Sequence, residues 1–473
     1  MSRTQRPTDI RIIGIQVFLL PIRTRVPLKF GTETLTQVSC LRVRMLVESG
    51  AGRLAEGWGE TPLSVQWVWP SPTPYGQRLA VMERFVQYLA HRLSTWTFSA
   101  HAFEMGVELL DAALPKWLTE FNANEEVPLP YLASLLIASA FDLALHDAQG
   151  TVLECDTYAT YAREVLPRPL SDFYGPQENA TAFSGRYLDD FLVRNPPTKL
   201  LVWHLVGALD PLSQGDEAGH DPQDGYPVLL SDWIKTDGLQ CLKIKLRGND
   251  CEWDFQRIVQ VAKVGMPLGV RLLSTDFNCT VRDPAYVLEI LDRLQRDHPQ
   301  VWEALAYVEQ PFPYELAELS LDVRSLALRK PLYLDESAHD WRHVHLGKKL
   351  GWNGVALKTC KTQTGALLSL CWARTHGMGI MVQDLTNPML AQIPHVRLAA
   401  HAGTEWGVES NAMQYYPAAS DPESLIHPGL YRRQNGSLDL QSLAGHSGAI
   451  IGFGYREAPQ CRELPEAIFD SLD

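Results

Sequence analysis

The fold of this chain is decided by five short apolar segments that each end in charged residues: CLKIKL at 241–246, VRLLSTDFN at 270–278, AYVEQP at 306–311, LYLDES at 332–337 and GVALK at 354–358. Successive charged ends are roughly 25 to 35 residues apart, which is the repeat of strand–helix units in a parallel barrel. The intervening stretches are predicted helices, at 253–264, 285–297, 315–328, 339–350 and 364–375. Because the carboxyl ends of barrel strands meet at one mouth, these segments would gather carboxylates and lysines in one pocket.

The rest of the barrel is predicted on either side of these segments. We assign 199–209 to the first strand and 379–384 to the seventh, with 407–411 as the best candidate for the eighth. The stretch 131–149 has small and apolar residues on nearly every face, which predicts a buried helix. Two irregular stretches have the character of insertions, at 167–197 and 214–226.

The first part of the chain predicts a separate small α+β domain. Its strands are expected at 10–20, 38–48 and up to 57–62, with a loop at 21–36, and its helices at 77–92 and 102–114, the last ended by Pro115. The tail is rich in glycine and turns, and we expect it to return to this domain. We therefore divide the chain into the small domain at 1–130, a barrel at 131–415 and a carboxy-terminal segment at 416–473.

Composition limits the classes of function. The chain has 473 residues, 45% of them hydrophobic and 21% charged. A formal net charge of −13 argues against non-specific nucleic-acid binding, because no basic surplus exists to neutralise phosphates. The eight cysteines form no CxxC pair, which favours reduced thiols. The apolar stretch 10–20 is interrupted by Arg11 and Gln16 and is not a signal peptide. We expect a cytoplasmic protein without a membrane span.

Taken together, the charged strand ends resemble the enolase superfamily, specifically the muconate-lactonizing-enzyme-like branch of the mandelate racemase/muconate lactonizing enzyme family. The matching residues are Lys-Ile-Lys at 243–245 for Lys-x-Lys on strand two, Asp-Phe-Asn at 276–278 for Asp-x-Asn on strand three, Glu-Gln-Pro at 309–311 on strand four, Asp-Glu at 335–336 on strand five and Lys358 on strand six. Gly-Trp-Gly-Glu-Thr-Pro at 57–62 resembles the capping-domain signature, and Ala-Leu-His-Asp-Ala at 144–148 resembles the bridge into the barrel. All five strand motifs in this order and spacing are specific.

The resemblance implies a modified TIM barrel, (β/α)7β, with an α+β capping domain formed from the N-terminal and C-terminal segments. It also implies one Mg²⁺ per active site, bound by Asp276, Glu309 and Asp335. The chemistry agrees, since three successive strand ends would deliver three hard oxygen ligands to one mouth. Individually, Asp276 and Asp335 could instead be helix N-caps, which strand-to-helix loops use often.

The implied activity is abstraction of the proton α to the carboxylate of a small substrate, which forms an enediolate dianion stabilised by the metal. Enolase-type sites pair a lysine or histidine base with Mg²⁺. By the family pattern Lys245 is the acid/base, Lys243 assists electrostatically, and Lys358 approaches the opposite face of the substrate. Four further residues are expected to support the site or contact substrate: Asn278, Glu336, Asp384 and Glu60. The loop at 23–33 and the turn at Glu60 are expected to cover the mouth.

Several reactions stay open at this point. Two bases on opposite faces suit racemisation or epimerisation, whereas one base with one cation suits a dehydratase, an o-succinylbenzoate-synthase-like lyase or a cycloisomerase. A non-catalytic metal-binding barrel is a third reading, which the presence of both Lys245 and Lys358 argues against. The sequence lacks a strand-seven histidine paired with a strand-six aspartate, and it lacks the strand-eight Asp-x-Asp of dipeptide epimerases. We also expect a homo-oligomer.

Overall fold

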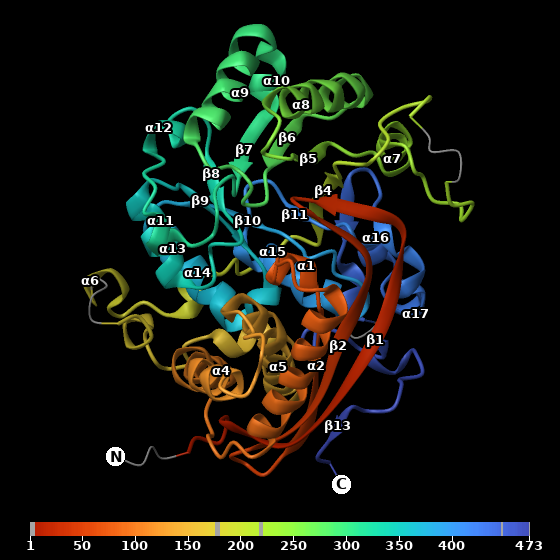
Figure 1. Cartoon of the computed structure of the whole chain (residues 1–473). Coiled ribbons are helices and arrows are strands. Elements are labelled where there is room, and N and C mark those ends of the chain that lie inside the picture. Colours follow the sequence, from red (N-terminus) through yellow and green to blue (C-terminus); the bar gives the residue numbers. More distant parts are fainter. Residues whose placement is uncertain (1–4, 176–179, 217–220, 446–447, 473) are drawn as a thin grey trace.

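The computed structural model describes residues 5–175, 180–216, 221–445 and 448–472, and it consists of a parallel barrel joined to a cap of antiparallel strands and helices (Figure 1). Both predicted insertions are partly described, but their residues 176–179 and 217–220 lie outside the described residues. The cap and the barrel together correspond to the predicted fold class, while the domain boundaries at 130 and 415 stay predictions.

Eight parallel strands close the barrel, because the last one pairs with both its predecessor and the first. The strands are β4 (Lys199–Val206), β5 (Cys241–Lys245), β6 (Leu272–Asp276), β7 (Leu305–Glu309), β8 (Leu332–Leu334), β9 (Gly354–Leu357), β10 (Gly379–Val382) and β11 (Val408–Glu409). The intervening helices are α7 (Leu230–Asp237), α8 (Cys251–Gly265), α9 (Pro284–Asp297), α10 (Pro299–Ala304), α11 (Leu316–Leu319), α12 (Arg324–Ala327), α13 (Trp341–Leu350), α14 (Gln363–Thr375) and α15 (Gln392–Ala402). The predicted (β/α)7β order is therefore confirmed.

One barrel helix differs from its prediction. The stretch 315–328 was expected to form a single helix, but it forms the two short helices α11 and α12. The first helix ends at Ser320, whose φ of 44° is left-handed and breaks the helical path. Apolar periodicity alone does not reveal such an ending, because the residue that usually marks a left-handed helix end is glycine and not serine.

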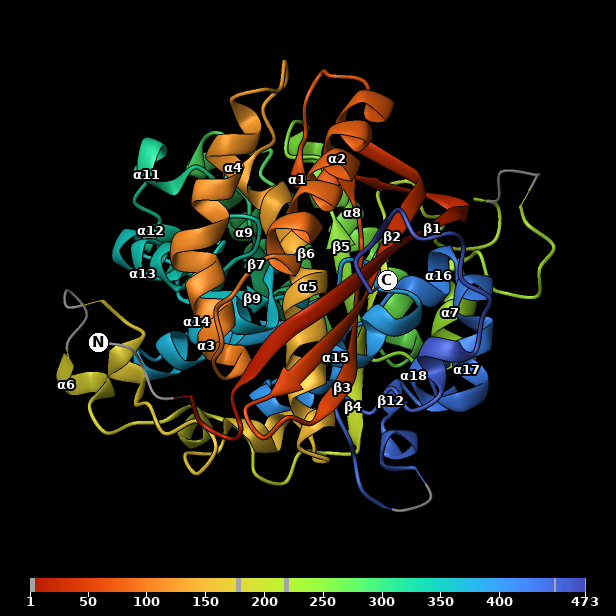
Figure 2. The ribbon, with the colours of Figure 1, turned by 90° about the horizontal axis from the view of Figure 1, so that it is seen from below.

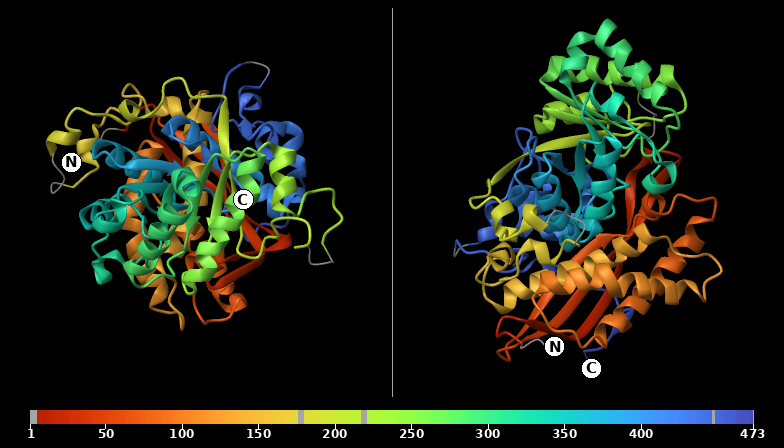
Figure 3. Two further views of the ribbon diagram at one scale, coloured as in Figure 1. Left: turned by 90° about the horizontal axis from the view of Figure 1, so that it is seen from above. Right: turned by 90° about the vertical axis from the view of Figure 1, so that its left-hand side faces the viewer.

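The cap is built around a four-stranded antiparallel sheet in the order β13-β1-β2-β3. Its strands are β1 (Ile10–Phe30), β2 (Glu33–Ser49), β3 (Leu54–Pro62) and β13 (Phe469–Asp470), and its helices are α1 (Val65–Val68), α2 (Tyr75–Ser94), α3 (Ala102–Glu108) and α4 (Leu114–Asn122). Figure 3 shows the red strands and orange helices of the cap lying together at one end of the molecule, with the green barrel strands at the other.

The predicted loop at 21–36 is wrong, because β1 and β2 continue through it as one long hairpin. Pairing is irregular between Arg23 and Leu28 and then resumes, and the turn lies at Gly31, whose φ of 48° is left-handed. Leu28 and Leu35 face each other in this outer part of the hairpin and are both buried. Pro27 and Gly31 suggested a loop in the sequence, but burial of Leu28, Phe30 and Leu35 sustains the strands.

The predicted end of a cap helix at Pro115 is also wrong. Helical structure continues to Asn122, and a π-helical turn at Leu109–Ala113 precedes the proline. The wider turn accommodates a ring that supplies no N–H, which explains why the proline does not end the helix.

The buried helix predicted at 131–149 is α5 (Tyr131–Val152), which packs against β2 and β3 (Figure 2). It is long and apolar enough to cross a membrane by length and composition, but 94% of its apolar window is buried inside the protein. Gly57 and Gly59 allow the close packing. A Cβ at these positions would lie 2.2 Å from Ala144 O and 2.0 Å from Ala140 O.

The tail contacts both parts of the molecule. After α16 (Ala412–Tyr415), α17 (Asp421–Ile426) and α18 (Pro428–Tyr431), strand β12 (Ser437–Asp439) pairs with barrel strand β4. Only β13 joins the cap sheet, where it pairs with β1. The tail also returns to the cap earlier, where Glu423 of α17 pairs with Arg42 of β2. The remaining helix, α6 (Ala180–Phe183), lies in the first insertion.

Candidate active site

The carboxyl ends of the barrel strands and the tip of the β1–β2 hairpin enclose a small cavity, which we call the chamber. Its volume is about 40 Å³. The lining residues are Leu28, Phe30, Leu35, Ser64, Trp67, Leu205, Lys243, Lys245, Asp335, Lys358, Asp384, Leu385, Thr386 and Glu409. The expected covering of the mouth by residues 23–33 is confirmed in part, since the hairpin tip supplies Leu28 and Phe30.

Strand register brings the first three charged positions to one level. Lys245 is opposite Asp276 in the β5–β6 pair, and Asp276 is opposite Glu309 in the β6–β7 pair. The Lys245 Nζ lies 2.5 Å from Asp276 Oδ2. Burial raises the pKa of Asp276, but the charges of Lys245 and Lys243 outweigh it and hold that pKa below its ordinary value.

Lys243 is the most enclosed of the lysines, with a side chain 2% exposed. Its Nζ donates to Glu309 Oε1 at 2.7 Å and to Glu409 Oε2 at 3.0 Å, and it lies 3.1 Å from Asp276 Oδ2. Burial alone would lower the pKa of Lys243, but Glu309 and Glu409 raise it well above its ordinary value. Lys243 therefore acts as a fixed positive charge between three carboxylates.

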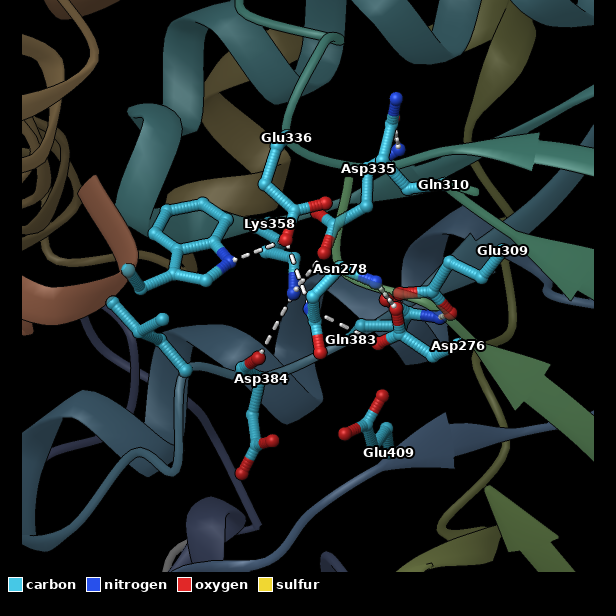
Figure 4. A network of polar contacts seen from close by, with 12 residues as sticks. Asp276, Asn278, Glu309, Gln310, Asp335, Glu336, Lys358, Gln383, Asp384 and Glu409 are labelled. Atoms are coloured by element: carbon cyan, nitrogen blue, oxygen red, sulfur yellow. Dashed lines mark hydrogen bonds and ion pairs between the residues drawn. The ribbon is translucent and has the colours of Figure 1, made fainter. Parts of the chain in front are cut away.

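Asp335 faces the other lysines. Lys358 Nζ lies 3.0 Å from Asp335 Oδ2 and donates to the backbone oxygen of Asp384 at 3.1 Å. Lys361 lies 3.4 Å from Asp335 Oδ1. Burial lowers the pKa of Lys358, but Asp335 reverses this and raises it overall. Figure 4 shows Asp335, Glu309 and Asp276 turned toward one shared region between the strands.

Gln310 explains why Asp335 is held in place. Its Oε1 accepts hydrogen bonds from the Asp335 N–H at 2.8 Å and from Ser337 Oγ at 2.7 Å, and its Nε2 donates to Phe312 O at 2.9 Å. Gln310 itself has a φ of 29°, which turns the chain sharply directly after Glu309. The amide thus fixes the strand-five end relative to the strand-four end.

The two expected supporting residues at the mouth lie together. Asn278 Nδ2 donates to Glu336 Oε1 at 2.9 Å, and Trp67 Nε1 donates to the same oxygen at 3.1 Å. Burial raises the pKa of Glu336 to about 6, with a further contribution from Asp335. Glu336 Oε2 and Asn278 Oδ1 are buried and have no hydrogen-bond partner among the described residues. Both therefore have capacity for a further ligand.

Glu60 is a correction to the sequence-based assignment. It is 1% exposed, and its carboxylate pairs with Arg42 of β2 at 2.5 Å rather than with any residue of the chamber. Its place on β3 turns it toward the carboxy-terminal segment, where Glu423 of α17 lies 3.1 Å from Arg42. Asp384 does line the chamber, but its side chain points away from Lys358 (Figure 4), and its Oδ2 accepts the Asn411 N–H at 2.8 Å.

Two residues at the mouth were missed in the sequence. Trp67, on α1, holds its ring 5.2 Å from Lys358 Nζ and 5.6 Å from Lys361 Nζ. No pattern in the sequence links a cap tryptophan to the barrel. Lys361 follows Lys358 by three residues, and the turn Thr359–Lys361 brings both to Asp335. Gln383 and Glu409, at the ends of the seventh and eighth strands, also accept hydrogen bonds from Lys243.

The charges in this cluster do not balance. Six carboxylates lie in it, those of Asp276, Glu309, Asp335, Glu336, Asp384 and Glu409, against four lysines, Lys243, Lys245, Lys358 and Lys361. Burial and the charge of Asp276 raise the pKa of Glu309 well above its ordinary value, although Lys243 opposes them. The buried cluster thus has an excess of two negative charges when all groups are ionised.

A divalent cation fits this donor set, although the side chains do not yet converge as ligands. Within the described part of the chain, no three acidic or histidine side chains already converge as a metal site. The reason is that Lys243 and Lys245 lie against Asp276, while Lys358 lies against Asp335. Hard carboxylate oxygens from successive strands, and two uncompensated negative charges, match the preference of Mg²⁺.

Comparison with known proteins agrees with this geometry. Residues 228–450 match the family model described as enolase C-terminal domain-like. A comparison with curated proteins gives no match. Many solved structures share the fold.

An N-succinyl Arg/Lys racemase from Bacillus cereus is 16% identical, with 98% of this chain and 99% of that chain covered and a TM-score of 0.61. A dipeptide epimerase from Enterococcus faecalis, complexed with Mg and a dipeptide, is 15% identical, with coverages of 94% and 99% and a TM-score of 0.60. A muconate lactonizing enzyme from Pseudomonas fluorescens is 15% identical, with coverages of 94% and 96% and a TM-score of 0.55. At these identities the likeness shows the fold. Residues 228–450 are thus enolase C-terminal domain-like, and the chain as a whole shares its fold with racemases, epimerases and muconate lactonizing enzymes.

Proposed function

We propose that this protein is a Mg²⁺-dependent enzyme that removes the proton α to a substrate carboxylate, and that it racemises or epimerises its substrate. The observation that carries the proposal is the shared chamber. Lys245 on β5 and Lys358 after β9 both line one cavity, with the carboxylates of the intervening strands between them. The substrate class is a small carboxylate.

Asp276, Glu309 and Asp335 would hold the metal. When bound, Mg²⁺ supplies a Lewis acid that stabilises the two negative charges of an enediolate. Lys243 remains beside Glu309 and Asp276 and contributes a fixed positive charge at the same place. Gln310 holds the backbone of Asp335, so that the strand ends keep their relative positions when substrate enters.

The two lysines transfer the proton. Strands β5 and β9 are four strands apart in a closed barrel of eight, so their ends approach a bound α-carbon from opposite sides. In racemisation one lysine is neutral and takes the proton at Nζ, while the other is protonated and returns it to the other face. Lys245 lies against Asp276 and Lys358 against Asp335, and the charge of Asp335 raises the pKa of Lys358.

The cap keeps water away from this transfer. Leu28, Phe30 and Leu35 of the hairpin and Trp67 of α1 form the apolar side of the chamber. Exclusion of water strengthens the electrostatic contacts inside the chamber and protects a carbanion-like intermediate from solvent protons.

A lyase or cycloisomerase is the second candidate, and one contact favours it. The ion pair of Lys358 with Asp335 raises the pKa of Lys358 and favours its charged form. Such an ammonium suits stabilisation of an intermediate or assistance to a leaving group, with Lys245 as the single base. Location in the cytoplasm and a homo-oligomeric state stay predictions.

The experiment is α-proton exchange in D₂O with panels of acid sugars, N-acyl amino acids and dipeptides. For racemisation, Lys245→Met should lose exchange with one antipode of a substrate and Lys358→Met with the other. For elimination, only one variant should lose proton abstraction. Wild-type turnover in both variants would remove the lysines from the mechanism.

A further inference from the structure

The chamber opens toward a larger pocket, which we call the vestibule. It has a volume of about 830 Å³ and is lined by residues of the hairpin tip and of the loops after β5, β6 and β7. Phe30 and Trp67 line both the chamber and the vestibule, so the two are adjoining parts of one site. A chamber of about 40 Å³ holds only a few water-sized groups. The rest of any substrate must therefore lie in the vestibule.

Three segments that carry cations meet at one edge of the vestibule. Lys29 comes from the hairpin, Arg247 from the loop after β5 and Arg282 from the loop after β6. All three segments touch around Thr280. A Cβ at Gly248 would lie 2.0 Å from Thr280 Oγ1, and one at Gly31 would lie 3.8 Å from Thr280 Cγ2. The three positive side chains thus belong to one local surface, the cationic edge.

In the part of the chain that the structure describes, none of these three cations forms a salt bridge, although Asp254 accepts the backbone N–H of Arg247 at 2.8 Å and interacts electrostatically with its guanidinium. Lys29 Nζ donates to the backbone oxygen of Thr32 at 2.9 Å. The guanidinium of Arg247 stacks 3.8 Å from the ring of Trp253, which orients its N–H groups without using them.

The acidic residues of the vestibule do not neutralise this edge. Glu33 lines the vestibule and lies 3.4 Å from Arg78, a residue that does not line it. Glu336 accepts hydrogen bonds from Trp67 and Asn278 at the chamber end. The remaining acid, Glu315, lies on the loop after β7, whereas the three cations come from the hairpin and from the loops after β5 and β6.

We propose that the substrate carries a second anionic group, a carboxylate or a phosphate, and that Lys29, Arg247 and Arg282 bind it while the reacting carboxylate lies in the chamber. This inference rests on the proposed function, because it places the α-carboxylate end at Lys245 and Lys358. Arginine donors with a fixed plane suit bidentate recognition of either anion. The edge also raises the local concentration of anionic substrates by long-range attraction.

The test compares ligands of equal length by calorimetry in the presence of Mg²⁺: adipate, hexanoate and an ω-phosphono monocarboxylate. Adipate should bind about ten-fold more tightly than hexanoate, since charge-assisted hydrogen bonds are the strong ones. In the double variant R247Q/R282Q this preference should fall to near unity. The matched control R296Q removes one exposed arginine that pairs with Asp297, and it should keep the preference. The phosphono ligand shows which anion the edge prefers.

Equal affinities of adipate and hexanoate for the wild type, including no measurable binding of either, would overturn the inference. A preference that survives in R247Q/R282Q would overturn it too. Proton exchange in D₂O tests the proposed function separately. An adipate preference without any exchange activity would keep the cationic edge and reject the enzyme.

Discussion

One buried charge cluster lies at the barrel mouth and another lies between the cap sheet and the carboxy-terminal segment, and the two are built differently. In the second cluster, Arg42 pairs with Glu60 at 2.5 Å and with Glu423 at 3.1 Å, and Arg462 pairs with Glu423 at 2.5 Å. Two guanidinium groups face two carboxylates, so this cluster is balanced. At the mouth, four lysines face six carboxylates.

The difference separates a structural role from a chemical one. Arginine keeps its charge and binds carboxylates in a fixed plane, which suits a permanent link between the cap strand β2 and helix α17. Lysine is a movable point charge whose protonation depends on its surroundings. A buried excess of negative charge is costly unless a cation joins it, and this imbalance is what we would expect of the proposed metal site.

The largest expected effect comes from removing a carboxylate at the mouth. Asp335→Asn should lower the rate of α-proton exchange about a thousand-fold or more, because a metal ligand and the partner of Lys358 are lost together. The rate is measured by proton exchange in D₂O, with circular dichroism to check the fold. Exchange at the wild-type rate would place the metal elsewhere.

Breaking the balanced cluster should affect stability instead of activity. Glu423→Ala leaves Arg42 and Arg462 without their shared carboxylate and should cost about 3–5 kcal/mol in the free energy of unfolding. Urea unfolding measures this cost, and activity per folded molecule should be unchanged. Asp292→Ala, which removes an exposed partner of Arg329, is the matched control and should cost less than about 1 kcal/mol.

Another buried carboxyl, that of Asp147, pairs with no cation among the described residues and sharpens the comparison. Asp147 accepts the N–H groups of Trp58 and Phe453, and burial raises its pKa to about 7. Because the folded pKa lies above the unfolded value of about 4, its contribution is complete below pH ~4 and is lost as the pH rises through about 7. Between pH ~5.5 and ~8 the free energy of unfolding of the wild type should therefore fall by roughly 2 kcal/mol more than that of Asp147→Asn, whose amide does not ionise. The same loss in wild type and variant, measured by urea unfolding, would contradict this.

The smallest expected effect concerns the contact between cap and mouth. Trp67→Phe keeps an aromatic ring near Lys358 but removes the hydrogen bond to Glu336. We expect KM to rise about five-fold with little change in kcat, in keeping with one lost hydrogen bond of about 1 kcal/mol. Steady-state kinetics on an active substrate gives both constants. A large fall in kcat alone would give Trp67 a role in the chemical step.

The barrel and its charged strand ends could be predicted because each unit repeats the same local pattern. An apolar strand ends in Asp276, Glu309 or Asp335, and the following helix returns the chain to the next strand. Parallel pairing then fixes which ends meet, as the opposition of Asp276 and Glu309 shows. The residues at the mouth therefore follow from strand order.

The contacts between cap and barrel could not be predicted in this way. Glu60 belongs to a motif of the capping domain, yet its side chain lies in the balanced cluster. A strand places alternate side chains on opposite faces, and the sequence does not say which face meets the barrel mouth. Trp67 reaches Glu336 across 269 positions of sequence, and no local pattern encodes that distance. The outer hairpin was read as a loop because the apolar partners of Leu28 and Phe30 come from the barrel.

The most direct test of the account is a calorimetric titration of Mg²⁺ into the wild type, Glu309→Ala and Glu60→Ala. The account predicts one Mg²⁺ per chain for the wild type, loss of that binding in Glu309→Ala, and retained binding in Glu60→Ala, because Glu60 lies in the balanced cluster. Normal Mg²⁺ binding in Glu309→Ala would contradict the assignment of the unbalanced cluster as the metal site.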